Sequence, residues 1–228
     1  MIEHVYRRAS AARSIASVIV VTDDERIHRA VIGFGGQSRM TSSAHQSGTD
    51  RIAEIAPSLA CDVIVNVQGD EPLIEPAMID EAVAPFSHDP SLMMSTLRRR
   101  IDDEAERQNP NVTKVVVDRD DFALYFSRAP IPHVRDGSPA APAWRHVGMY
   151  AYRRDCLMRL AALTPTALER SEALEQLRAL EHGIRIKTLE THFDSIGVDT
   201  PEDLERVRSM VAENEPFGRH AHDATASC

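Results

Sequence analysis

The sequence predicts an α/β protein with a mostly parallel sheet that is covered by helices on both faces. Three observations lead to this fold class. Helical and strand-like segments alternate along the first half of the protein, the order expected when helices join parallel strands. Residues 63–67 form a short β-branched run that is typical of a buried strand. The protein has 228 residues and 43% hydrophobic content, enough to bury the core of one domain.

The first half of the sequence has clear helix signals. Apolar residues recur at helical spacing from Ile2 to Ala9. Thr22 and Glu25 have the spacing of a capping box, and Ser47 suits an N-cap. The predicted elements, in order, are a helix over residues 2–9, a strand over 18–21, a helix from 22 to about 33, a strand near 39–40, a helix from 47 to about 59 and the strand over 63–67.

The second half of the sequence adds strands and a capped final helix. Thr200 suits the N-cap of that helix, with Pro201 at its first position and Asp203 reaching back. We expect one domain over residues 1–215 and a disordered polar tail over 216–228. The predicted elements are a helix over 76–84, strands over 92–97, 112–117 and 122–126, a surface loop over 130–142, a strand over 147–152, helices over 155–162 and 168–182, and a strand over 184–189.

Composition excludes several function classes. The formal net charge of −9 argues against a nucleic-acid-binding surface. Cys61, Cys156 and Cys228 are odd in number and widely spaced, so they predict neither a disulfide framework nor a zinc motif. No apolar run is long enough to span a membrane, and the charged first residues do not resemble a signal peptide. These features favour a reduced, cytoplasmic setting.

Acidic residues follow two predicted strands. Asp70 comes directly after the run 63–67, at the carboxyl end where open α/β sheets place ligands. Its carboxylate is a ligand that Mg²⁺ prefers, although a polar turn that caps a strand explains the segment equally well. Asp199 precedes the capped final helix. It either pairs with Asp70 around one cation or only supports the helix cap.

Other polar residues have both a binding and a structural interpretation. The helix that begins at Ser47, with Arg51 one turn in, is either an anion site or an ordinary surface helix. Arg128 follows an aromatic strand and suits a carboxylate or a surface salt bridge. Alternation places His146 and Tyr150 on one strand face, which lines either a pocket or a half-buried sheet. Glu175 and Gln176, on a predicted helix, face either solvent or a ligand.

Seven segments together resemble the 3-deoxy-manno-octulosonate (Kdo) cytidylyltransferase family, also called CMP-Kdo synthetases. The segments occur in the family's order and extend from Met1 to about Arg208. The resemblance implies a Rossmann-like fold of the nucleotide-diphospho-sugar transferase type and a homodimer. The segments are HQSGTDR (45–51), VNVQGDEP (65–72), NPNVTKVV (109–116), ALYFSR (123–128), HVGMYAY (146–152), LEQLR (174–178) and GVDTPEDL (197–204).

The resemblance also implies an activity. Members of this family transfer CMP from CTP to Kdo, with release of pyrophosphate, for lipopolysaccharide biosynthesis. Asp70 and Asp199 would ligate Mg²⁺. The nucleotide side would contain Ser47, Arg51 and Gln68, and the Kdo side would contain Arg128, His146, Tyr150, Glu175 and Gln176.

The sequence departs from the family pattern at its first residue. Family members begin with a strand and a loop that supplies arginine and lysine to the CTP phosphates, about 25–30 residues in all. The segment that begins at Met1 resembles the part of the family sequence that lies just after that loop. We therefore expect two strands with a free edge, weak or absent activity, and lower stability than that of a complete member. A start codon assigned too far downstream would account for this departure.

Two alternatives to Kdo transfer stay open on the sequence alone. The protein is either an inactive, truncated member that serves at most as a binding or dimerising module, or a cytidylyltransferase for another acidic sugar, such as amino-Kdo or sialic acid.

Overall fold

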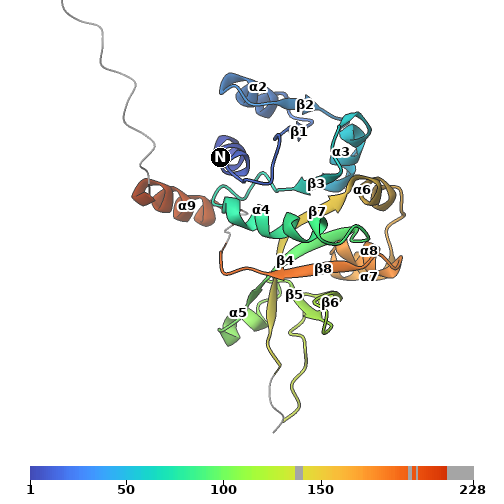
Figure 1. Ribbon diagram of the computed structural model, residues 1–228. Coiled ribbons are helices and arrows are strands. Elements are labelled where there is room, and N and C mark those ends of the chain that lie inside the picture. Colours follow the sequence, from blue (N-terminus) through green and yellow to red (C-terminus); the bar gives the residue numbers. More distant parts are fainter. Residues whose placement is uncertain (137–140, 195–196, 199, 215–228) are drawn as a thin grey trace, which may run out of the picture.

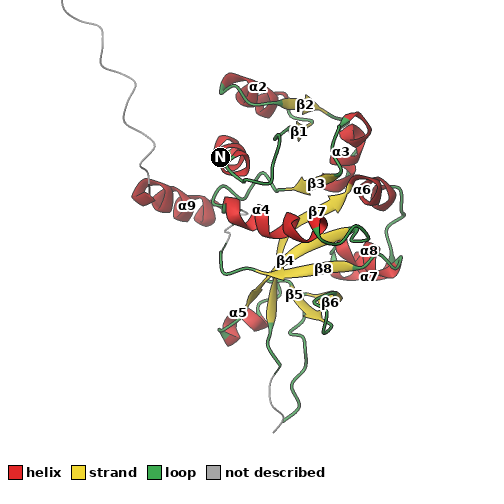
Figure 2. Cartoon of the chain, in the orientation of Figure 1, coloured by secondary structure: helices red, strands yellow, loops and turns green. Residues whose placement is uncertain are grey.

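The computed structural model describes residues 1–136, 141–194, 197–198 and 200–214. A six-stranded sheet crosses the middle of the molecule, and a two-stranded sheet lies beside it, with helices packed around both (Figures 1 and 2). This arrangement confirms the predicted α/β class. The predicted disordered tail, residues 216–228, lies outside the described residues, and so does Asp199. No helix in the described ranges is long and apolar enough to cross a bilayer.

The larger sheet is organised around its longest strand, β7 (Trp144–Arg153). One edge of β7 pairs with β4 (Met94–Arg100), which pairs in turn with β8 (Ile186–Glu190). The other edge is shared. Its carboxyl half pairs with β3 (Val63–Asn66), and its amino end pairs with β5 (Lys114–Val117). Strand β6 (Ala123–Ser127) completes the sheet beside β5.

The prediction of a mostly parallel sheet holds for strand direction but not for strand pairing. Strands β3, β4, β5 and β8 run in one direction, because β7 is antiparallel to β3, β4 and β5 and because β8 is parallel to β4. Among the strand pairs of this sheet within the described residues, only β4–β8 is parallel. The cause is that β7, which occurs late in the sequence, lies between strands of the opposite direction.

Helices cover both faces of this sheet. Alternate side chains of β7 enter two separate apolar clusters. Tyr152 packs into one with Phe126 and Leu177. Met149 packs into the other with Met78. The first cluster lies under α6 (Arg154–Ala161) and α8 (Gln176–Glu181), and the second lies under α4 (Pro76–Val83).

The smaller sheet joins β1 (Val20–Thr22) and β2 (Ser38–Met40) in parallel. Helix α2 (Glu25–Gly33) links the two strands and contacts α1 (Ile2–Ser10), and α3 (Gly48–Ile55) leads toward β3. The predicted cap at Thr22 is wrong by two residues. Asp24 is the N-cap of α2 and accepts a hydrogen bond from Arg26 N–H, while Thr22 Oγ1 accepts one from Asp24 N–H.

The helices near the carboxyl end agree in part with the predicted elements. The predicted helix over 168–182 is divided into α7 (Ala167–Glu172) and α8, because Ala173 adopts a left-handed conformation with φ of 52°. The final helix, α9 (Pro201–Asn214), has its predicted cap, in which Thr200 Oγ1 accepts from Asp203 N–H at 3.1 Å. A further short helix, α5 (Glu104–Gln108), was not predicted.

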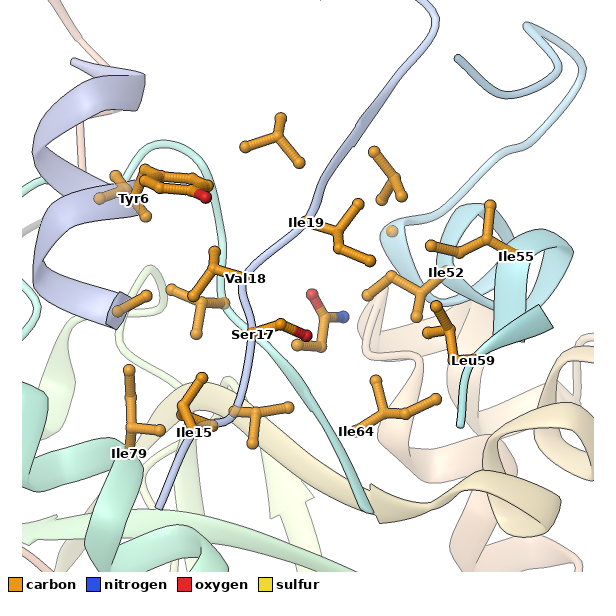
Figure 3. A pocket seen from close by; sticks show the side chains of 18 of the residues that line it. Tyr6, Ile15, Ser17, Val18, Ile19, Ile52, Ile55, Leu59, Ile64 and Ile79 are labelled. Atoms are coloured by element: carbon orange, nitrogen blue, oxygen red, sulfur yellow. The ribbon is translucent and has the colours of Figure 1, made fainter. Parts of the chain in front are cut away.

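An apolar groove of about 690 Å³ separates β1 from β3. Ile19, which precedes β1, Ile52 from α3 and Ile64 from β3 line it (Figure 3). Neither β1 nor β3 has a hydrogen-bonded strand on its groove side in the part of the protein that the structure describes. This finding agrees with the expectation of two strands with a free edge.

The hydrogen bonds show which backbone groups face the groove. Val20 N–H donates to Gln37 C=O, and Thr22 C=O accepts from Thr41 N–H, so the backbone groups of Val21 point away from β2. On the other side, Val63 and Val65 alternate with the residues of β3 whose backbone bonds to β7.

Candidate active site

Asp70 lies in the turn after β3, at the carboxyl end of that strand. It is partly buried, and its carboxylate has no hydrogen bond or ion pair within the described residues. Its backbone carbonyl oxygen accepts a hydrogen bond from Val198 N–H at 2.9 Å, which brings the segment before α9 to this turn. Because Asp199 is outside the described residues, its pairing with Asp70 stays a prediction.

The amino end of α3 lies against the end of β3. Ser47 caps the helix, as predicted, by accepting a hydrogen bond from Asp50 N–H at 3.2 Å. A Cβ atom added to Gly48 would lie 3.6 Å from Asn66 Nδ2 and 3.7 Å from Gln68 Nε2. The free N–H groups of a first helical turn favour anions, and the two nearby amides add polar contacts. The structure therefore brings Ser47 and Gln68 to one corner.

Arg51 lies one turn further along α3 and is held by the small sheet. Its Nη1 donates to Thr41 Oγ1 at 2.9 Å and lies 3.3 Å from Asp23 Oδ1. Asp23 follows β1 and Thr41 follows β2. These contacts fix the guanidinium of Arg51, which helps to line the groove and whose side chain is 18% exposed. A ligand anion would share Arg51 with Asp23.

Two rings from β7 form a neutral wall. The rings of His146 and Tyr150 lie 5.3 Å apart, which confirms that these residues share a strand face. His146 is buried, and its Nε2 is hydrogen-bonded to Thr96 Oγ1 at 3.0 Å. Burial, with a smaller contribution from Arg145, lowers the pKa of His146 to about 3. Burial also raises the pKa of Tyr150 well above its ordinary value, so neither ring is charged near neutral pH.

Arg128 follows β6 and is tied to the end of α7. Its Nε donates to the backbone carbonyl oxygen of Glu172 at 2.8 Å, and its Nη1 lies 3.3 Å from the carbonyl oxygen of Pro110. No ion pair to the Arg128 guanidinium occurs among the described residues, so its charge is available to a ligand carboxylate.

The corner between α7 and α8 presents Glu175 and Gln176. Glu175 Oε1 accepts a hydrogen bond from Thr49 Oγ1, in the first turn of α3. Gln176 is 6% exposed at the start of α8. The Thr49–Glu175 contact joins the predicted nucleotide side, at α3, to the predicted sugar side, at the α7–α8 corner.

Comparison with known proteins agrees with this geometry. A family model described as cytidylyltransferase matches residues 1–186. The 3-deoxy-manno-octulosonate cytidylyltransferase of Geobacter sulfurreducens is 54% identical over 217 residues, which cover 91% of this protein and 87% of the relative. The chain belongs to the cytidylyltransferase family. The protein of the same name in Pelobacter propionicus is 56% identical over 218 residues, 91% of this protein and 86% of the relative.

A solved structure extends the likeness to three dimensions. It is described as CMP:2-keto-3-deoxy-manno-octonic acid synthetase complexed with CTP and is 43% identical to this protein. The two structures superpose with a TM-score of 0.89 over 94% of this protein and 88% of the other. The resemblance seen in the seven sequence segments is therefore confirmed.

The described side chains of this cytidylyltransferase offer one carboxylate, that of Asp70, to a hard cation. No group of three or more His, Cys, Asp or Glu side chains that could hold a metal is found in the described ranges. The Asp70 carboxylate, partly buried and without a protein partner there, suits Mg²⁺, which usually keeps few protein ligands and takes the rest from phosphate and water.

Sequence reasoning missed several residues that hold the cytidylyltransferase site together. Thr49 and Glu172 contact the predicted site residues Glu175 and Arg128 from distant positions in the sequence, and Asn66 lies beside Gly48 and accepts a hydrogen bond from its near neighbour Gln68. Thr49 and Asn66 lie inside the segments 45–51 and 65–72, so the resemblance offered a signal for them. Glu172 had no such signal, because its contact with Arg128 spans 44 residues.

Proposed function

We propose that this protein transfers CMP from CTP to Kdo and releases pyrophosphate, a reaction that serves lipopolysaccharide biosynthesis. Two relatives that carry this activity in their name are 54% and 56% identical to it, which supports the proposal. The geometric observation that carries it is the Thr49–Glu175 hydrogen bond, because this bond joins the two predicted halves of the site.

Each half suits one substrate. The N–H groups at the start of α3, with Ser47, Gln68 and Arg51, suit the nucleotide. Arg128 suits the carboxylate of Kdo, because a guanidinium binds two carboxylate oxygens at once. The neutral His146 and Tyr150, together with Glu175 and Gln176, suit the sugar hydroxyls. Since both substrates are anions, Arg128 also offsets the repulsion between them.

The proposed reaction is an in-line displacement. The anomeric hydroxyl oxygen of Kdo forms a bond to the α-phosphorus of CTP, and the bond from that phosphorus to the bridging oxygen breaks. Pyrophosphate leaves with the electron pair of the broken bond, and the hydroxyl proton passes to solvent. Asp70, with Asp199, would hold Mg²⁺, which when bound would supply positive charge next to the phosphates.

Pyrophosphate release tests this proposal. The protein is incubated with CTP, Mg²⁺ and, in separate reactions, Kdo, amino-Kdo or sialic acid. We expect slow release with Kdo and a further fall of about tenfold or more in kcat/KM for Kdo in Arg128→Lys, since charge-assisted hydrogen bonds contribute about 1.5–3 kcal/mol. Faster release with another sugar would reassign the substrate. No release with any sugar at high protein concentration would support the inactive binding module instead.

We also propose a homodimer in a reducing, cytoplasmic setting. The family resemblance supports the dimer, and the free thiols of Cys61 and Cys156 fit a reducing compartment. Light scattering on the eluting protein would give twice the monomer mass of 25.3 kDa if the dimer forms and that mass itself if it does not.

A further inference from the structure

Lys114 is a buried cation that the proposed reaction does not use. The residue is 0% exposed, in the first position of β5. Its Nζ donates three hydrogen bonds to backbone carbonyl oxygens, those of Asn109 at 2.9 Å, Val112 at 2.5 Å and Arg128 at 2.5 Å. An ammonium has three hydrogens, so all are used and none is left for a ligand.

The three acceptors belong to two segments. Asn109 and Val112 lie in the turn before β5, and Arg128 lies just after β6. A buried ammonium is unfavourable unless its hydrogen bonds are complete, and burial accordingly lowers the pKa of Lys114. The lysine therefore binds the Arg128 backbone to the adjacent turn, at the point where Arg128 enters the site.

Glu172 holds the same arginine from the opposite side. Its Oε2 accepts from Arg128 N–H at 2.9 Å, and its Oε1 accepts from Ser127 Oγ at 2.6 Å. Its backbone carbonyl oxygen accepts from Arg128 Nε at 2.8 Å. Burial alone would raise the pKa of this carboxyl, but the hydrogen bonds from Ser127 and Arg128 keep it below its ordinary value.

Glu172 also connects Arg128 to the rest of the sugar side. It is the last residue of α7, and Glu175 and Gln176 follow it after the left-handed turn at Ala173. Figure 1 shows α7 and α8 beside β6, and α8 and β6 are in contact. The position of Glu172 thus sets both the direction of the guanidinium and its place relative to the α7–α8 corner.

We propose that Lys114 and Glu172 are positioning residues that fix Arg128 from its two sides and so determine the affinity for a carboxylated sugar. The inference rests on the proposed function, in which Arg128 binds the substrate carboxylate. Neither residue contacts substrate. Replacement of either residue should weaken the binding of the acidic sugar and leave the affinity for the nucleotide unchanged.

Steady-state kinetics of Glu172→Gln and Lys114→Met give the first test. We expect the KM for Kdo to rise about 10-fold or more, because a charge-assisted contact is lost in each variant. The KM for CTP should stay within about twofold. Lys187→Met is the matched control, since Lys187 Nζ also donates to a backbone carbonyl oxygen, that of Asp120 at 2.5 Å. In an Arg128→Ala background, Glu172→Gln should add no further loss.

A second readout does not depend on turnover. In protein labelled with ¹⁵N-arginine, the Nε–H signal of Arg128, assigned by its loss in Arg128→Lys, should exchange slowly with solvent. We expect exchange about tenfold faster in Glu172→Gln and Lys114→Met and unchanged exchange in Lys187→Met. If Lys114→Met does not fold, Glu172→Gln carries both tests.

The outcomes separate the two proposals. An active wild type with an unchanged KM for Kdo in Glu172→Gln overturns the positioning role and leaves the proposed function in place. Unchanged Arg128 exchange in both variants overturns it as well. An inactive wild type overturns the proposed function, and the exchange measurement alone then decides whether Lys114 and Glu172 fix Arg128.

Discussion

Replacement of Glu169 by glutamine should unfold the protein at a much lower denaturant concentration. Glu169 and Arg178 form a buried pair between α7 and α8, with side chains 11% and 7% exposed. Arg178 Nε donates to Glu169 Oε2 at 2.8 Å, and Nη2 donates to Oε1. The same Oε2 accepts from Thr166 N–H at 3.0 Å.

The loss in free energy of unfolding follows from this geometry. Opposite charges about 4 Å apart attract by about 4 kcal/mol at an effective dielectric constant of about 20. Removing one partner of a buried pair typically destabilises by about 3–5 kcal/mol, because the other charge stays buried. We therefore expect Glu169→Gln to lower the free energy of unfolding by about 3 kcal/mol or more. The double variant Glu169→Leu/Arg178→Met, which leaves no buried charge, should lose less than the single one.

Urea unfolding followed by circular dichroism measures these differences. The hydrogen bonds of Arg178 help to hold the pKa of Glu169 below its ordinary value of 4.5, against the effect of burial. A carboxyl whose pKa is lower in the folded state stabilises that state fully at pH values above its ordinary pKa. This contribution to stability is lost as the pH falls through the folded-state pKa. The gap between wild type and Glu169→Gln should therefore narrow below about pH 4.5. A gap under about 1 kcal/mol at pH 7, or a double variant as unstable as the single one, would refute the reasoning.

Three further predictions concern other buried groups. Because burial holds the pKa of His146 near 3, its imidazole NMR signals should not titrate between pH 5 and 9 in the folded protein; a midpoint near 6.5 would contradict the buried, neutral ring. Burial raises the pKa of the Cys156 thiol to about 11, so iodoacetamide should modify it only after unfolding, and rapid labelling of native protein would place it at the surface. The groove between β1 and β3 has the volume of a ligand pocket and an apolar lining, so it should bind the dye 8-anilinonaphthalene-1-sulfonate; Ile52→Glu should abolish the fluorescence gain, and an unchanged gain would place the dye elsewhere.

Local chemistry made much of this structure predictable. The caps at Ser47 and Thr200 were found because a side-chain oxygen before a helix has one common use, and each accepts the expected N–H. The strand that ends at Asn66 was recognisable from its β-branched residues. In contrast, nothing in the helix-forming run over 168–182 signalled the break at Ala173, because alanine rarely adopts the left-handed conformation that it has there.

Contacts between residues far apart in the sequence could not be predicted. Alternation of helices and strands does not reveal that β7 enters the sheet between β3 and β4 in the opposite direction. The candidate site depends on the same kind of contact. Thr49 reaches Glu175 across 126 residues, and Arg128 reaches Glu172 across 44. Residue type indicated which groups could bind anions, while only the fold showed which of them lie together.

The separation of the two sheets has a consequence for local unfolding. The ladder between β1 and β2 protects some of their amide protons, but no strand ladder in the described residues joins this pair to the larger sheet, so helix packing holds it to the core. We expect this unit to open sub-globally at a lower free energy than the core around β4 and β7. Arg51 is anchored to that unit through Asp23 and Thr41. A nucleotide bound at Arg51 would therefore slow hydrogen exchange in β1 and β2, and folding of the small sheet would be thermodynamically linked to nucleotide affinity.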